Sequence, residues 1–125
     1  MCGIYGSTKL FDQSIIQDKL RISQFRGPDY SDHRIINKKI IMGHNRLSIL
    51  DLEERSNQPF TYNNIVIVFN GEIYNFSHLR DQLVKLDYKF TTFSDTEVVC
   101  AMFQEYREKC VNYFIGMFSF VLYDT

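Results

Sequence analysis

The chain of 125 residues has no tryptophan, two prolines and three cysteines, and it lacks the long apolar run of a membrane-spanning helix, about 20 residues. Cys2, Cys100 and Cys110 are scattered, so their spacing predicts neither a disulfide framework nor a metal site. The N-terminus has neither the basic start nor the apolar stretch of a signal peptide, and a cytoplasmic location is therefore expected.

The chain also has no marked excess of positive or negative charge. Lys and Arg number 14 and Asp and Glu 15, so the formal net charge is −1. No basic face is evident, and the sequence implies neither nucleic acid nor a membrane surface as a partner. A hydrophobic content of 45% is enough for a real core, and the length favours one domain, residues 1–125.

The first half of the chain predicts a strand, a helix and a hairpin. Residues 2–6 form a short strand. Residues 12–25 form a helix that Asp12 can cap, with Ile16 and Leu20 at helical spacing. Segments 33–36 and 39–42 flank Asn37-Lys38, which suits a tight turn.

The second half alternates strands and helices. Residues 65–69 are a β-branched and aromatic run, typical of a strand buried on both faces, and Asn70-Gly71 ends it. Further elements are predicted as follows: a helix marked by Leu79, Leu83 and Leu86 and capped by Asn75 or Ser77, a strand at 89–93, a helix after a Ser94–Glu97 capping box, and a strand at 117–123. This mixture indicates an α+β layered domain. Nothing follows the last strand to cover its edge, so we expect a fragment of something longer.

Cys2 becomes an N-terminal nucleophile if Met1 is trimmed, as is normal before a small residue. An α-amine titrates near ~7.7–8.0 and a thiol near ~8.5, so the amine can act as general base for its own side chain. Alone, a cysteine at position two is more often ordinary.

The remaining motifs favour the interpretation of Cys2 as a nucleophile over that of an ordinary cysteine. In chain order they are Cys2-Gly3-Ile4-Tyr5-Gly6, Arg26-Gly27-Pro28-Asp29, His44-Asn45-Arg46-Leu47-Ser48-Ile49, Asn70-Gly71-Glu72-Ile73-Tyr74-Asn75, Ser94-Asp95-Thr96-Glu97 and Gly116-Met117-Phe118. Together they resemble the glutaminase domain of glutamine-hydrolysing asparagine synthetases, which are class II glutamine amidotransferases and N-terminal-nucleophile hydrolases. The resemblance covers the whole chain. It departs at Phe25, where relatives often have His, and in length, since family domains add further strands.

The resemblance implies a four-layer α-β-β-α sandwich, incomplete at its C-terminus, and a role for each matched residue. Cys2 is the nucleophile, and the Asn70 amide with the Gly71 N–H forms the oxyanion hole. The substrate-binding set consists of Arg46 for the carboxylate, Asp95 for the ammonium, and Leu47, Ile49 and Glu72.

Each assignment has a plainer alternative. Arg46 suits a surface salt bridge, and Asn70-Gly71 suits a hairpin turn. Asp95 is favoured anyway in the first turn of a helix. The other polar residues are interpreted as structural: Ser94 and Glu97 as caps, Arg26, Asp29 and Asp51 as support, and His33, His44 and His78 as surface or packing residues.

The implied reaction is hydrolysis of L-glutamine to glutamate and ammonia through a Cys2 thioester. The ammonia serves asparagine synthesis or a related amidation by a synthetase domain or subunit, which is absent here together with its ATP and Mg²⁺ sites. No cofactor or metal is expected in this chain. A homo-oligomer is left open, and the alternative function is an inactive fragment acting as an interaction or regulatory module.

Overall fold

The fold is α+β, with two antiparallel three-stranded sheets. The computed structural model describes residues 1–10 and 12–125. The first sheet has the order β1-β3-β2 and the second the order β4-β5-β6. The strands are β1 Gly3–Ser7, β2 Tyr30–Ile36, β3 Ile40–Arg46, β4 Phe60–Tyr62, β5 Ile65–Ile73 and β6 Gly116–Asp124. The helices are α1 Gln13–Ile22, α2 Phe76–Val84 and α3 Asp95–Tyr106, with 3₁₀ turns at Gln24–Arg26, Glu54–Ser56 and Arg107–Tyr113.

The first sheet and α1 largely match their predictions. Asp12 caps α1 by accepting a hydrogen bond from the Ser14 N–H at 2.9 Å, and Ile16 and Leu20 pack on Ile41. The helix ends at Ile22, before the predicted Phe25. In the hairpin, Asn37 and Lys38 have φ of 49° and 52°, the left-handed geometry of a two-residue turn.

Strand β5 alternates between two cores, as predicted for a strand buried on both faces. Val66 and Val68 face the first sheet, whereas Ile67 and Phe69 pack toward the helices. The predicted end at Asn70-Gly71 is wrong. The strand continues to Ile73 because β6 pairs with it throughout, from Ile65↔Asp124 to Ile73↔Gly116.

Helix α2 buries Leu79 and Leu83 as predicted, but Leu86 lies beyond its end and is 49% exposed. Asn75 occupies the N-cap position without a capping bond. Its side chain instead donates to the Tyr113 carbonyl and accepts from the Ile115 N–H, both at 2.9 Å. Asn75 therefore ties α2 to the start of β6.

The predicted strand at 89–93 is wrong, and the capping box is half correct. Ser94 Oγ accepts from the Glu97 N–H at 3.4 Å, so Ser94 caps α3. The Glu97 carboxylate does not return to Ser94. It is 1% exposed and accepts from the backbone N–H groups of Thr91 and Thr92. Those two donors are thereby lost to any strand pairing.

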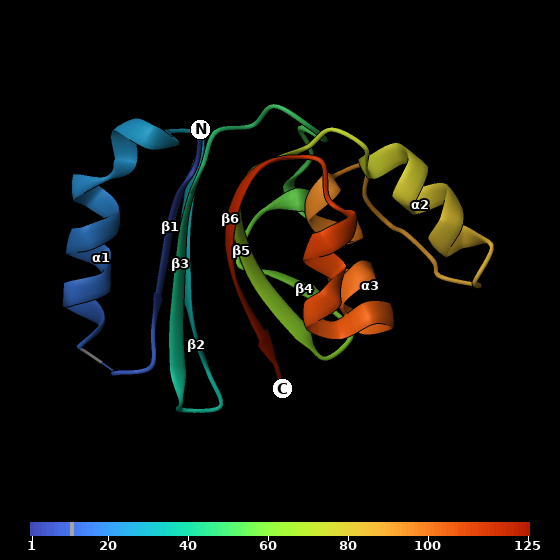
Figure 1. Cartoon of the computed structure of the whole chain (residues 1–125). Coiled ribbons are helices and arrows are strands. Elements are labelled where there is room, and N and C mark those ends of the chain that lie inside the picture. Colours follow the sequence, from blue (N-terminus) through green and yellow to red (C-terminus); the bar gives the residue numbers. More distant parts are fainter. Residues whose placement is uncertain (11) are drawn as a thin grey trace.

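The N-terminus lies at one end of the first sheet, where β1 begins (Figure 1). Figure 1 shows α1 outside the first sheet, the two sheets face to face, and α2 and α3 outside the second sheet. Between the sheets lies an apolar core formed by Ile36, Ile40, Met42, Val66 and Val68. None of the helices in residues 1–10 and 12–125 has the length and hydrophobicity of a membrane span.

We predict that His44 makes the fold acid-sensitive. His44 is fully buried, and burial lowers its pKa to about 4. Unfolded histidine takes up a proton below ~6.5, so stability is lost as the pH falls from there toward 4, by about 3 kcal/mol in total. Urea unfolding between pH 7 and 4 should show this extra loss in the wild type and not in His44→Gln. Equal pH dependence in the two proteins would contradict the prediction, and His33→Gln serves as the control.

Candidate functional site

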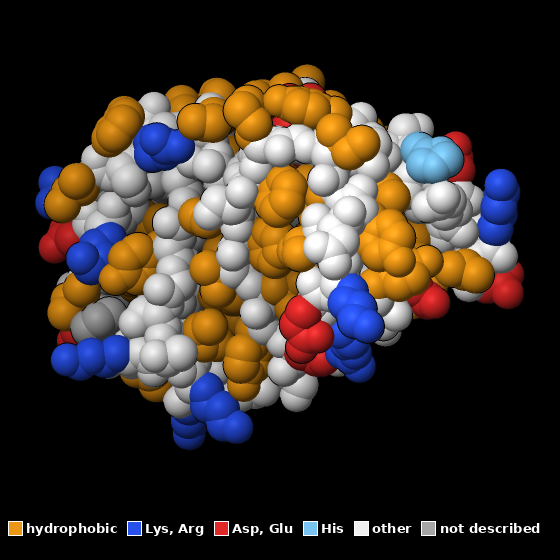
Figure 2. Space-filling model, in the orientation of Figure 1, with side chains coloured by type: hydrophobic (Ala, Val, Ile, Leu, Met, Phe, Trp, Pro, Cys, Tyr) orange, Lys and Arg blue, Asp and Glu red, His pale blue; other side chains and the backbone are white. Residues whose placement is uncertain are grey.

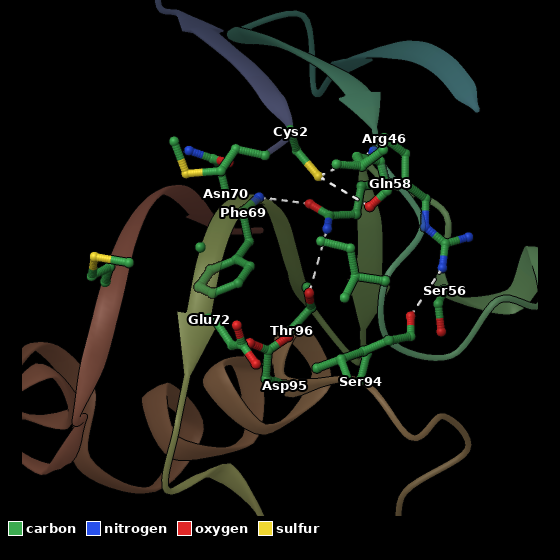
Figure 3. A pocket seen from close by; sticks show the side chains of 16 residues that line it. Cys2, Arg46, Ser56, Gln58, Phe69, Asn70, Glu72, Ser94, Asp95 and Thr96 are labelled. Atoms are coloured by element: carbon green, nitrogen blue, oxygen red, sulfur yellow. Dashed lines mark hydrogen bonds between the residues drawn. The ribbon is translucent and has the colours of Figure 1, made fainter. Parts of the chain in front are cut away.

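One cavity of about 140 Å³ brings together every site residue predicted from the sequence. Its lining includes residues of the segment after β3, which Figure 1 shows crossing from the first sheet to the second. The predicted residues on its lining are Cys2, Arg46, Leu47, Ile49, Asn70, Gly71, Glu72 and Asp95. Figure 3 shows Cys2 at one end of this site and the carboxylates of Glu72 and Asp95 at the other.

Cys2 immediately precedes β1 and is half-buried. Its sulfur accepts a hydrogen bond from the Leu47 N–H at 3.4 Å and lies 3.7 Å from the Leu47 carbonyl oxygen. The Arg26 Nε–H donates to the Cys2 carbonyl at 3.1 Å, in line with the predicted supporting role of Arg26. The Leu47 backbone therefore holds the sulfur at the wall of the cavity.

Asn70 and Gly71 sit in a strand, not in the hairpin turn that their sequence also suits. The Asn70 Oδ1 is buried without a hydrogen-bond partner among the described residues, which is rare for a polar atom. Gly71 has φ +152°, and a Cβ there would overlap the Met117 carbonyl oxygen. Only glycine fits this position, because β6 passes so close.

Asp95 begins α3 and is 5% exposed. Its Oδ2 accepts from the Ile73 N–H at 3.0 Å. Burial raises the pKa of Asp95 above 3.8 and the nearby Glu72 charge adds to this, while backbone N–H groups of Ile73 and Thr96 oppose it. Two carboxylates at one end of a cavity suit a cationic group, whose charge would offset their repulsion.

Arg46 ends β3 and is 5% exposed, so it is not the surface salt bridge considered as an alternative. Its guanidinium binds neutral oxygens of the segment 47–57, which we name the crossing loop. Nη1 donates to the Glu53 carbonyl at 3.1 Å and to Asn57 Oδ1 at 2.8 Å. Nη2 donates to the carbonyls of Leu50 and Asp51. Arg46 therefore holds the loop that forms one wall of the cavity.

Residues 1–125 match the sequence model of a protein family described as "Glutamine amidotransferase domain". This chain belongs to that family. It is 35% identical over 99% of its length to "Asparagine synthetase [glutamine-hydrolyzing] 1" of Bacillus subtilis, of which it covers 21%. It is 45% identical over 79% of its length to "Probable asparagine synthetase [glutamine-hydrolyzing]" of Schizosaccharomyces pombe, covering 18% of that protein. The amidotransferase domain thus spans about a fifth of these relatives.

The amidotransferase domain has further lining residues that the sequence reasoning missed. They are Met1, Leu50, Ser56, Gln58, Phe69, Ser94, Thr96 and Met117. Gln58, Phe69 and Thr96 were not assigned to the site, since each is an ordinary side chain whose position depends on tertiary contacts. Ser94 was predicted as a cap, and it both caps α3 and borders the cavity.

Two predicted supporting residues hold the crossing loop. Asp29 accepts from the Ser48 N–H at 2.7 Å, and Asp51 accepts from the Phe93 N–H at 2.7 Å and pairs with Arg55. His44 is a buried packing residue, as expected, and its Nε2 lies 3.1 Å from the Phe69 carbonyl oxygen. No cluster of three metal-binding side chains occurs in residues 1–10 and 12–125.

The cavity mouth is apolar. Met1, Ile49 and Met117 line the cavity and are each about two-thirds exposed, at 65%, 65% and 66%. Figure 2 shows hydrophobic side chains along the upper edge of the molecule, the edge at which Figure 1 places the N-terminus.

We predict that Gly71→Ala destabilises the amidotransferase domain by more than about 1 kcal/mol, because a side chain at this φ is strained and meets backbone. Urea unfolding at pH 7 measures the loss. Gly3→Ala is the matched control, since a Cβ at Gly3 comes no closer than 3.4 Å to its neighbours. Equal free energies of unfolding for Gly71→Ala and the wild type would show that the close approach of β6 is not a constraint.

Proposed function

We propose that the chain hydrolyses L-glutamine to glutamate and ammonia, with Cys2 as the nucleophile. One observation carries the proposal: a single cavity has the Cys2 thiol at one end and the carboxylates of Glu72 and Asp95 at the other. Glutamine has the matching polarity, since its amide and its α-ammonium lie at opposite ends of the molecule. The family membership supports the same reaction.

Removal of Met1 is the first requirement, because it converts the peptide nitrogen of Cys2 into an amine. Met1 lines the cavity, so its loss also enlarges the space for substrate. The freed amine takes the thiol proton, and the sulfur attacks the amide carbon. The C–N bond then breaks, the amine's proton leaves with ammonia, and a γ-glutamyl thioester remains. Water hydrolyses the thioester to glutamate and restores the thiol.

Charge develops on the amide oxygen during attack, and we assign its stabilisation to Asn70 and Gly71. Both residues line the cavity. No described residue binds the Asn70 Oδ1, so no hydrogen bond to this oxygen opposes an orientation in which the Asn70 N–H₂ faces the substrate. Losing one such donor typically costs about 2.7–4 kcal/mol of transition-state stabilisation.

The α-ammonium and the α-carboxylate of glutamine bind different residues. Asp95 and Glu72 bind the α-ammonium. Arg46 binds the α-carboxylate, which displaces carbonyl oxygens of the crossing loop from the guanidinium. A carboxylate is the stronger acceptor, and Arg presents it with a planar pair of donors. Leu47 and Ile49 complete the wall on that side.

The wider context is also proposed. One apolar core lies between α1 and the first sheet, a second between the two sheets, and a third between the second sheet and the α2–α3 pair. This arrangement supports assignment to the four-layer sandwich of N-terminal-nucleophile hydrolases. In a longer parent, ammonia passes to a synthetase domain or subunit that amidates aspartate or another acid, with ATP and Mg²⁺ used only there. The relatives' names support this partner. The cytoplasmic location stays a prediction of the sequence.

We predict that the purified chain lacks Met1 by mass spectrometry and releases glutamate and ammonia from glutamine. Cys2→Ala should lower the rate by more than about 1,000-fold, as loss of a nucleophile does elsewhere. A variant with lysine inserted between Met1 and Cys2 keeps the thiol, blocks its amine and should be equally inactive. Cys100→Ala, which changes a buried thiol outside the cavity lining, should remain active. Activity that survives Cys2→Ala would remove Cys2 from the mechanism.

We predict that glutamine binding weakens in acid because protonated Asp95 loses the ammonium. The pKa of Asp95 lies above 3.8, so KM should rise as the pH falls toward that pKa. Asp95→Asn should raise KM about 10- to 100-fold at pH 7, the strength of a charged hydrogen bond, and remove this pH dependence. Inhibition by glutaramate, which lacks the α-amine, provides the control and should be unchanged. Equal weakening for glutaramate would show that Asp95 acts on the fold and not on the ammonium.

A further inference from the structure

Phe69 is the last residue before the proposed oxyanion hole, and side chains hold both of its backbone polar groups. Pairing of β4 with β5 stops at Phe60↔Ile67, so β4 does not reach Phe69. The Phe69 N–H donates to Gln58 Oε1 at 2.6 Å, and the Phe69 carbonyl oxygen lies 3.1 Å from His44 Nε2. The buried side chains of Gln58 and His44 thus bind the backbone groups that a neighbouring strand would otherwise pair with.

Gln58 also reaches the other end of the site. Its Nε2 donates to Thr96 Oγ1 at 3.4 Å, and Thr96 follows Asp95 in the first turn of α3. Asp95 in turn binds the Ile73 N–H. Residues 70–72 are therefore held at both sides, at Phe69 by Gln58 and His44 and at Ile73 by Asp95. Figure 3 shows the chain of contacts from Phe69 through Gln58 to Thr96.

Gln58 borders the cavity but its amide is engaged within the protein, and His44 lies outside the cavity lining. His44 is 0% exposed and does not line the cavity. Gln58 is 6% exposed, and both its oxygen and its nitrogen are already bonded within the protein. The Gln58 amide, bonded at both polar atoms, makes a rigid link, since breaking either bond leaves an unpaired group in a medium of low polarity.

We propose that Gln58 and His44 are positioning residues that clamp Phe69 and so fix Asn70 and Gly71 in the geometry that stabilises the oxyanion. This inference rests on the proposed glutaminase function. The clamp acts on the transition state, because the developing oxyanion depends on the placement of Asn70 and Gly71, whereas ground-state binding depends on the charged groups around Asp95 and Arg46. Misplacement of about 1 Å can cost about 100-fold in rate.

The test compares Gln58→Leu, which keeps the size and removes both hydrogen bonds, with Gln58→Glu, which keeps an acceptor for the Phe69 N–H. Gln58→Leu should lower kcat roughly 10- to 100-fold with little change in KM for glutamine. Gln58→Glu should recover most of that loss. His44→Gln keeps a donor for the Phe69 carbonyl and should likewise exceed His44→Leu in kcat. Leu83→Ala, a core change in α2 outside the cavity, controls for lost stability.

A second readout does not require activity. Hydrogen exchange followed by NMR should show the Phe69 amide exchanging about 10-fold faster in Gln58→Leu, with shifted Asn70 and Gly71 amide signals. Leu83→Ala should leave those signals in place. Unchanged amides in Gln58→Leu would overturn the clamp, and so would displaced amides with a wild-type kcat. If the Asn70 and Gly71 amide signals shift in Gln58→Leu but the wild type has no glutaminase activity, the clamp stands and the proposed function is overturned.

Discussion

The packing of one sheet on the other is the interaction on which the site depends. Cys2 immediately precedes β1 of the first sheet, and Asn70 lies in β5 of the second. Packing of Met42 of the first sheet against Val68 of the second brings the two sheets, and with them these two residues, together around one cavity. That apolar contact is not directional, so it brings the sheets together without setting the position of any one atom. Hydrogen bonds across the sheets, above all His44 to Phe69, supply the finer placement.

Periodicity and turn chemistry predicted much of the fold. Ile16 and Leu20 mark the buried face of α1, and Asn37-Lys38 forms the turn of the first hairpin, because both signals act within a few residues. The cavity residues were predicted by resemblance, and they do lie around one space. Their roles remain proposals, since shared location does not by itself establish chemistry.

The errors arose where a distant partner outweighed a local preference. Asn70-Gly71 is a strong turn signal, yet pairing with β6 keeps it extended. Residues 89–93 suit a strand, yet the buried Glu97 carboxylate accepts from the N–H groups of Thr91 and Thr92. Gln58 carries no local signal at all, and its contacts with Phe69 and Thr96 exist only in the folded chain. Such contacts between segments far apart in sequence are what single-sequence reasoning lacks.

The most direct test of the account is the site at which a glutamine-like diazoketone attaches to the protein. Peptide mapping by mass spectrometry after a short incubation should find one adduct, on the sulfur of Cys2, and excess L-glutamine should prevent it. Cys100 and Cys110 are buried and should stay unmodified. Labelling on those thiols, or labelling of Cys2 that glutamine does not slow, would contradict the claim that this cavity holds glutamine against Cys2.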